Sequence, residues 1–275
     1  MQLEDKVENM KVGIVGFGSI GFDVGNRIDQ GIENFKLVGV SSKTKEKVLK
    51  KISSFKNKPP FLNLDELCKR SDVILDCAPK KAFKSVLQNC LLNKTKLITI
   101  SGSGILENFE LVKNANQSKI QVVLASGAIL GLDGLRAASE GTIYSVNMIT
   151  RKPPNALASA KYVLENKISL KNLSEKKLIF NGSAKDGAKA FPANVNVAAA
   201  IGLAGIGPEK TNLEIWADPS LEKNTHHVFV KSDSSDFEIK VQNIQSIENP
   251  GTGKITALSM IACLRGLVSS LKTGT

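Results

Sequence analysis

The sequence lacks the long apolar segments that membrane and secreted proteins carry. No apolar run among its 275 residues approaches the ~20 residues that a bilayer-spanning helix needs. Its first ten residues, MQLEDKVENM, are polar and contain no apolar signal-peptide core. The sequence therefore predicts neither membrane insertion nor secretion, and we expect a cytoplasmic protein.

Histidine and cysteine are scarce as well. The only two histidines, His226 and His227, are adjacent, and the four cysteines form no C-x-x-C pair. No H-E-x-x-H motif or cluster of carboxylates accompanies them, so the sequence predicts no metal site. We expect buried, reduced thiols. The absence of a G-x-S-x-G elbow also argues against a serine hydrolase.

Arginine-rich blocks are absent and tryptophan and tyrosine are few, and both observations bear on what the net charge of +11 means. Nucleic-acid-binding proteins cluster their cations and interleave aromatic residues, whereas here the lysines are scattered and the chain has one Trp and two Tyr. We therefore expect a lysine-rich solvated surface and no nucleic-acid partner. A positive field would still attract phosphate cofactors and dicarboxylates.

A glycine-rich loop near the N-terminus is the first feature that points to function. An apolar run at 12–15 leads into the spacing G-x-G-x-x-G and then into a helix-like stretch. These glycines allow a tight turn, a close approach of backbone to pyrophosphate, and helix–strand packing. A simple packing device is the alternative, but the position at the first strand favours a dinucleotide site. The predicted cofactor-binding residues here are Gly16, Gly18, Ser19, Ile20 and Gly21.

The next strand, at 36–40, bears on the choice between NAD and NADP. A site that prefers NAD has an acidic residue at the end of this strand, which binds the ribose 2′-hydroxyl. This chain has Ser41, Ser42 and Lys43 there. Two hydroxyls and an ammonium suit a 2′-phosphate, so the sequence favours NADP, or use of both cofactors. The alternative is that Lys43 is merely exposed.

Strands and helices alternate over residues 1–127, which predicts a Rossmann domain with a doubly wound parallel sheet. Further strands are expected at 72–78, 96–100 and 121–124, with helices at 63–70, 80–92 and 106–116. The strand at 72–78 leads into a loop at 77–79, which places Ala78 at the carboxyl edge of the sheet, where a dinucleotide binds.

The pattern changes from residue 128 and predicts a second α/β domain with an open mixed sheet over 128–253. Strands are expected at 142–150, 178–180, 212–217, 226–231 and 237–241, and helices at 129–138 and 195–204. A final amphipathic helix within 254–271 is expected to pack against the first domain, to which we assign residues 254–275.

Few residues of the second domain suit acid–base or anion-binding chemistry. Since neighbouring strand residues point to opposite faces, at most one histidine faces a given cleft. Asn224 lies two positions before His226 and shares its face, which favours His226 as the acid or base. A histidine pair without a role is the alternative.

Two other stretches of this domain suit anionic ligands. Arg151 and Lys152 precede a diproline turn and suit a carboxylate-bearing substrate, although a solvated strand end is equally compatible. The turn at 249–252 could bind an anion through the hydroxyl of Thr252, or it could simply be a turn.

Several stretches together resemble the L-aspartate dehydrogenases. They are GIVGFGSIG (13–21), SGAILGLDGLRAA (126–138), TRKPP (150–154), FNGSAKDGAKAFPANVNVAAAIGLAGIG (180–207), ADPSLEKNTHH (217–227) and NPGTGKITALSMIACLR (249–265). The resemblance implies a Rossmann domain, a mixed-sheet domain and a homodimer. It implies oxidation of L-aspartate by NAD or NADP to iminosuccinate, which yields oxaloacetate and ammonia, or the reverse amination. His226 matches the family's active-site histidine, and Ala128 and Asn194 match its cofactor contacts.

Two stretches depart from the family pattern. VKSDSSDF replaces a V-x-G-x-F-G turn after the histidines, and Asn-Pro-Gly-Thr-Gly replaces N-P-K-T-S at 249–253. Two alternative functions stay open: another amino-acid dehydrogenase of the homoserine type on the same scaffold, and a protein that senses NAD(P) without turnover.

Overall fold

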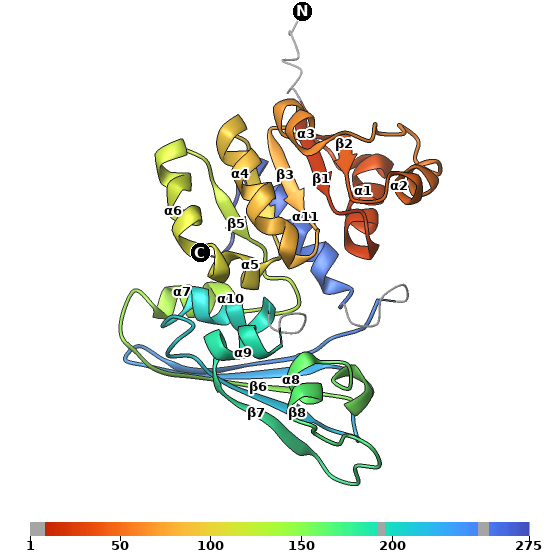
Figure 1. Cartoon of the computed structure of the whole chain (residues 1–275). Helices are drawn as coiled ribbons and strands as arrows, with labels where there is room; N and C mark the ends of the chain where they lie inside the picture. Colours follow the sequence, from red (N-terminus) through yellow and green to blue (C-terminus); the bar gives the residue numbers. More distant parts are fainter. Residues whose placement is uncertain (1–8, 192–195, 247–252, 275) are drawn as a thin grey trace, which may run out of the picture. The chain divides into compact units, whose positions relative to one another are not determined.

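The chain folds into two compact units in the computed structural model, which describes residues 9–191, 196–246 and 253–274 (Figure 1). Unit 1 comprises residues 1–125 and 257–270, and unit 2 comprises residues 126–256 and 271–275. The division at 125/126 lies two residues from the predicted 127/128. Residues 254–256 and 271–275 group with unit 2, whereas the sequence placed them with the first domain.

Unit 1 contains a five-stranded parallel sheet in the order β2-β1-β3-β4-β5. Its strands are β1 (Met10–Val15), β2 (Phe35–Ser41), β3 (Val73–Asp76), β4 (Lys96–Thr99) and β5 (Val122–Leu124). Short apolar strands joined by helices form such sheets because both faces are then buried. The predicted doubly wound parallel sheet is confirmed.

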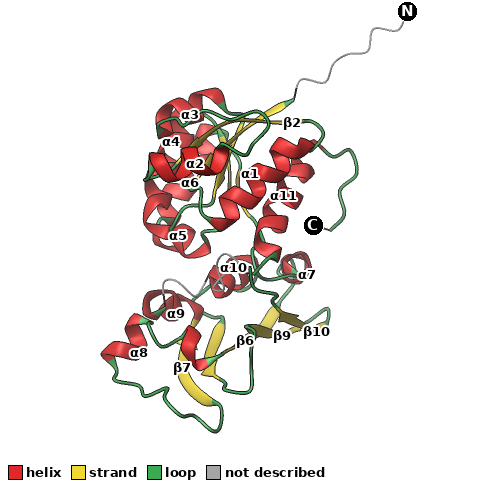
Figure 2. Cartoon of the chain, turned by 90° about the vertical axis from the view of Figure 1, so that its right-hand side faces the viewer, coloured by secondary structure: helices red, strands yellow, loops and turns green. Residues whose placement is uncertain are grey.

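Seven α-helices are described in or at the edge of unit 1, and Figure 2 shows several of them beside the sheet. They are α1 (Ser19–Gly31), α2 (Lys45–Ile52), α3 (Leu64–Arg70), α4 (Phe83–Asn93), α5 (Gly102–Glu107), α6 (Phe109–Ser118) and α11 (Ile255–Val268), with a 3-10 turn η1 at Lys80–Ala82. Helix α11 contributes Met260 and Leu264 to the same apolar core as Val12 of β1 and Val24 of α1. The C-terminal helix thus packs into unit 1, as its apolar periodicity predicts.

Two local features of unit 1 differ from the sequence prediction. Helix α2 was not predicted, because its lysine-rich sequence buries only Val48 and Ile52 and gives little apolar periodicity. The single helix expected at 106–116 is two helices that meet at Asn108, whose backbone is non-helical. Asn108 bonds the Gly104 carbonyl with its side chain, which competes with continuation of the helix.

Unit 2 contains a five-stranded mixed sheet in the order β10-β9-β6-β8-β7. Its strands are β6 (Ile143–Lys152), β7 (Lys177–Ser183), β8 (Asn212–Ala217), β9 (Thr225–Ser232) and β10 (Asp236–Gln242). Only β6 and β8 run parallel among these neighbours; the other pairs are antiparallel. The predicted open mixed sheet is confirmed.

Helices cover one face of this sheet, as Figures 1 and 2 show within unit 2. They are α7 (Leu132–Ala138), α8 (Lys161–Glu165), α9 (Ala184–Ala190) and α10 (Asn196–Ala204), with a 3-10 turn η2 at Pro154–Ala156. Alternate residues of β6, β8 and β9 are accordingly buried. Within the described residues, every helix is too short or too polar to cross a lipid bilayer.

Candidate active site

The glycine loop between β1 and α1 has the geometry of a nucleotide cradle. Gly16 has a φ of +84°, and a Cβ there would lie 2.5 Å from the Ala78 Cα. A Cβ on Gly21 would overlap the carbonyl oxygen of Gly16. A Cβ on Gly18, by contrast, would meet no atom of the described chain within 4 Å, so the space beside its backbone is open. Two glycines are thus required by close packing, and the third leaves room for a ligand.

The start of α1 suits the negative charge of a pyrophosphate. Gly18 is the N-cap and offers no side-chain hydrogen bond, and the first turn contains no acidic residue. Ser19 and Ile20 are half-buried at this end. The first N–H groups of a helix and its dipole favour an anion at such a position.

The end of β2 lies beside the glycine loop. The Gly16 amide donates a hydrogen bond to the Ser41 carbonyl at 2.8 Å, which fixes the two segments together. Ser42 is half-buried and Lys43 is exposed immediately after it. The two serines and the lysine therefore lie at the carboxyl end of β2, beside the glycine loop.

The loop after β3, which contains Ala78, is held by a buried carboxylate. The Ala78 amide donates to Asp76 Oδ1 at 3.1 Å, and the Thr99 hydroxyl donates to Oδ2 at 2.8 Å. Burial raises the pKa of Asp76 to about 6, although both hydrogen bonds oppose that shift. These contacts fix the loop that packs against Gly16.

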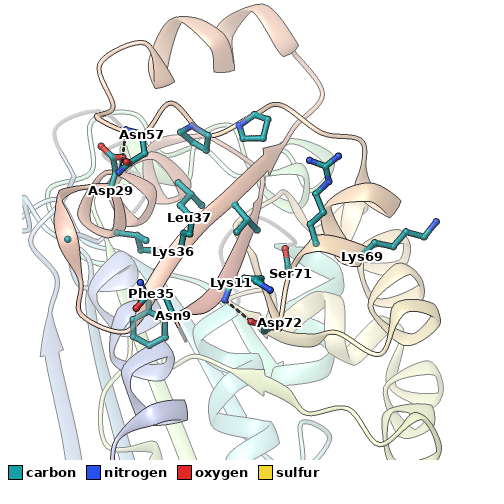
Figure 3. Close-up of a pocket in the computed structure, with 16 residues that line it drawn as sticks. Asn9, Lys11, Asp29, Phe35, Lys36, Leu37, Asn57, Lys69, Ser71 and Asp72 are labelled. Carbon is teal, nitrogen blue, oxygen red and sulfur yellow. Dashed lines mark hydrogen bonds between the residues drawn. The ribbon is translucent and has the colours of Figure 1, made fainter. Parts of the chain in front are cut away.

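A wide depression of about 1010 Å³ lies at the other end of the same sheet (Figure 3). Its lining includes Lys11, Lys36 and Asp72, which stand at the amino ends of β1, β2 and β3. Its buried carboxylate, Asp29, accepts hydrogen bonds from the amides of Lys56 and Asn57 and is thereby satisfied. The depression is thus separate from the glycine loop, and Asp29 has a structural role.

In unit 2, His226 lies on the helix-covered face of the sheet. It is 4% exposed, and its Nδ1 lies 3.1 Å from the hydroxyl of Thr150. The two residues are direct partners in the antiparallel β6–β9 register. Thr150 is 3% exposed, so the contact is shielded from solvent.

Lys152 is on the same face, two residues beyond Thr150 on β6, and is 5% exposed. Burial lowers the pKa of Lys152 to about 8. Burial, and to a smaller extent the charge of Lys152, lower the pKa of His226 to about 3. At neutral pH the face therefore holds a neutral imidazole and a buried cation.

Two asparagines complete this polar face. Asn224 directly precedes β9, and its carbonyl accepts a hydrogen bond from the Asn243 amide at 3.1 Å, which extends the β9–β10 register by one residue. Its side-chain Oδ1 is buried without a hydrogen-bond partner among the described residues. The Asn243 side chain donates to the Ala128 carbonyl at 3.1 Å. A buried acceptor without a donor is uncommon and suits a ligand that brings a donor.

Residues that are adjacent in the sequence lie on opposite faces of the unit 2 sheet. Strand β6 extends through Lys152, so Arg151 points to the opposite face, next to Thr225 and Trp216 in register. His227 also points there, and its Nε2 lies 2.8 Å from Glu238 Oε2. The structure thus groups Lys152 and Asn224 with His226, and it does not bring Arg151 to them.

Two predicted site residues, Asn194 and Thr252, lie outside the described residues. Within the part of the chain that is described, no three His, Cys, Asp or Glu side chains gather as a metal site would require. Thr150 and Asn243 were missed by the sequence reasoning. Thr150 meets His226 through strand pairing, and Asn243 meets Ala128 from a position 115 residues away, so neither contact has a local signal in the sequence.

Comparison with known proteins matches each unit to a described family. A family model for the C-terminal region of aspartate dehydrogenase matches residues 133–267. A model for the NAD-binding domain of homoserine dehydrogenase matches residues 16–125. The two matches divide near the boundary between the two units.

Individual relatives match over almost the whole chain. The L-aspartate dehydrogenase of Bradyrhizobium diazoefficiens is 39% identical over 97% of this chain and 94% of its own length. That of Methanosarcina acetivorans is 37% identical over 97% of this chain and 100% of its own. The crystal structure of aspartate dehydrogenase from Thermotoga maritima is similar with a TM-score of 0.75 and 28% identity, covering 97% and 100% of the two chains.

Proposed function

The chain belongs to the L-aspartate dehydrogenase family, and on that premise we propose that it oxidises L-aspartate with NAD(P) to iminosuccinate, or runs the reverse reductive amination. Hydrolysis of the imine then gives oxaloacetate and ammonia. The observation that carries the proposal is the helix-covered face of unit 2, where a buried imidazole and a buried cation lie together.

This face suits the charges of aspartate. Lys152 is a buried cation that can bind a substrate carboxylate by a charge-assisted hydrogen bond. The unsatisfied Asn224 Oδ1 can accept from the substrate ammonium. A carboxylate beside Lys152 also offsets the charge that helps to lower the pKa of His226, so substrate binding favours proton uptake by the imidazole.

The oxidation needs one proton acceptor and one hydride acceptor. His226 takes a proton from the substrate ammonium, and the freed lone pair forms the C=N bond as the α-hydrogen leaves with its electron pair. A bound nicotinamide supplies the acceptor for that hydride. The protein's part is to hold the substrate and to keep His226 neutral and ready.

The glycine cradle of unit 1 fits a dinucleotide, because the space beside Gly18 is open and the start of α1 is free of acidic residues. We assign unit 1 to cofactor binding and unit 2 to substrate binding, catalysis and dimerisation. By family resemblance, Ala128 and Asn194 of unit 2 also contact the cofactor.

A steady-state assay in both directions tests the proposal. The purified chain should reduce NAD or NADP with L-aspartate, and oxidise the reduced cofactor with oxaloacetate and ammonia. Homoserine and L-glutamate serve as competing substrates. Turnover of homoserine without aspartate would establish the homoserine-type alternative, and cofactor binding without any turnover would establish a sensor.

We propose NADP, or use of both cofactors, from Ser41, Ser42 and Lys43. Replacing Lys43 by glutamate should weaken NADP binding about 10- to 100-fold, because a hydrogen bond to a charged phosphate is lost. NAD binding should change little. Titration of both cofactors by calorimetry checks this, with the exposed Lys47→Glu as the charge-matched control. Equal loss for the two cofactors, or a strong NAD preference in the unaltered chain, would refute it.

We also propose a homodimer. The face of the unit 2 sheet opposite the helices carries half-buried Ile149, Trp216 and Phe229, together with exposed Leu178. Apolar side chains on an uncovered sheet face favour a protein partner. Light scattering should give about twice the chain mass of 29.5 kDa.

A further inference from the structure

The hydroxyl of Thr150 is the one side-chain group that the structure places in hydrogen-bond contact with His226 among the described residues. The contact joins Thr150 Oγ1 to His226 Nδ1 at 3.1 Å, leaving Nε2 without a protein partner that is described. Each residue faces the other directly across the β6–β9 pair. The β6–β9 register places the imidazole, and among the described side chains Thr150 supplies the hydrogen bond that holds the ring.

A hydroxyl can either donate to Nδ1 or accept from it, and the two cases differ chemically. A neutral imidazole carries one N–H. When Thr150 donates to Nδ1, the hydrogen of the ring is on Nε2, which then has no lone pair for a proton. When Nδ1–H donates to Thr150, Nε2 keeps its lone pair and can act as the base.

We propose that Thr150 is a positioning residue whose Oγ1 accepts the Nδ1–H of His226 and so keeps Nε2 as the proton-accepting atom. This inference rests on the proposed function, in which His226 accepts the proton of the substrate ammonium. Thr150 touches neither substrate nor cofactor in this account; it acts through the ring.

The surroundings of Thr150 and His226 leave few other groups that could fix the tautomer of the ring. Both side chains are almost fully buried, so the hydrogen bond between them is shielded from solvent. On the other side of His226 in the register lies Val241, which has no hydrogen-bonding side chain. Thr150 is thus the neighbour in the sheet that can select between the two tautomers.

Nitrogen NMR of histidine-labelled protein tests the tautomer directly and needs no turnover. The chain has only two histidines, and a His227→Gln variant assigns the remaining signals to His226. The cross-peaks between ring nitrogens and carbon-bound ring protons differ between the two tautomers. We expect Nδ1 to be protonated in the unaltered chain and in Thr150→Ser, and we expect Nε2–H to gain population in Thr150→Val.

Kinetics supply the second measurement. Thr150→Val should lower kcat for aspartate about 10- to 100-fold, the range known for loss of a group that orients a metal-ligating histidine. KM and cofactor affinity should change little, and Thr150→Ser should restore most of kcat. Thr225→Val is the matched control, because Thr225 adjoins His226 on β9 but points to the other face of the sheet.

Three results would overturn the proposal: protonated Nε2 in the unaltered chain, an unchanged tautomer and kcat in Thr150→Val, or a serine variant as impaired as the valine variant. If Thr150→Val does not fold, the spectrum of the unaltered chain and the serine variant still decide. If aspartate is not oxidised at all, the proposed function fails, whereas the spectra still report on the role of Thr150.

Discussion

Replacing His226 by alanine is expected to lower turnover of L-aspartate about 10²- to 10⁴-fold, the range for loss of a general acid–base group. The imidazole is buried and neutral. Its described side-chain partner, the Thr150 hydroxyl, does not take up a proton at neutral pH and so cannot replace it as the base. The glycine cradle lies in unit 1, so NAD(P) affinity should be preserved. Steady-state kinetics and a cofactor titration measure the two effects separately.

The adjacent histidine provides the control for this experiment. His227 points to the opposite face and contacts Glu238, so His227→Ala should change turnover only mildly. Equal losses in the two variants would mean that the effect is structural. Turnover at the unaltered level in His226→Ala would remove His226 from the mechanism.

Replacing Lys152 by methionine is expected to weaken binding of a dicarboxylate about 10²-fold, since a charge-assisted hydrogen bond to a buried cation is lost. Methionine keeps much of the aliphatic volume and adds no charge. Succinate is a suitable probe because it is a dicarboxylate that cannot be oxidised at a C–N bond. Its inhibition constant against aspartate measures the effect, and cofactor affinity is the internal control.

The pH dependence of succinate inhibition should identify the same lysine. Burial lowers the pKa of Lys152 to about 8, so the side chain is charged below that pH and loses its charge as the pH rises through it. Succinate should therefore bind less tightly above pH 8 in the unaltered chain, and this loss should be absent in Lys152→Met. A pH-independent inhibition constant in the unaltered chain would contradict the assignment.

The Arg151→Met variant tests whether Arg151 binds the substrate together with Lys152, as the sequence predicts, or whether Lys152 binds it alone, as the structure indicates. The sequence treats Arg151 and Lys152 as a pair of cations for one substrate. In the structure they point to opposite faces of β6, so Arg151→Met should affect succinate far less than Lys152→Met. Equal weakening of succinate binding in the two variants would favour binding by both Arg151 and Lys152.

The fold was predictable to the extent that its signals are local. The glycine spacing and the apolar periodicity of the strands and of α11 all act within a few residues. Helix α2 escaped prediction because its few apolar residues give weak periodicity, and the break at Asn108 depends on one side-chain hydrogen bond. Such features depend on contacts that periodicity does not encode.

The sequence by itself determined the α/β fold class and the family, and it predicted the glycine loop as the cofactor site and His226 as the acid or base. Only the tertiary structure decided which residues surround that histidine. Thr150 and His226 are 76 positions apart and meet because β6 and β9 pair in one register. That register also puts Lys152 on the same face of the sheet as His226, and Arg151 on the opposite face. Side-chain alternation is a local property, but the choice of neighbouring strand follows from packing of the whole sheet.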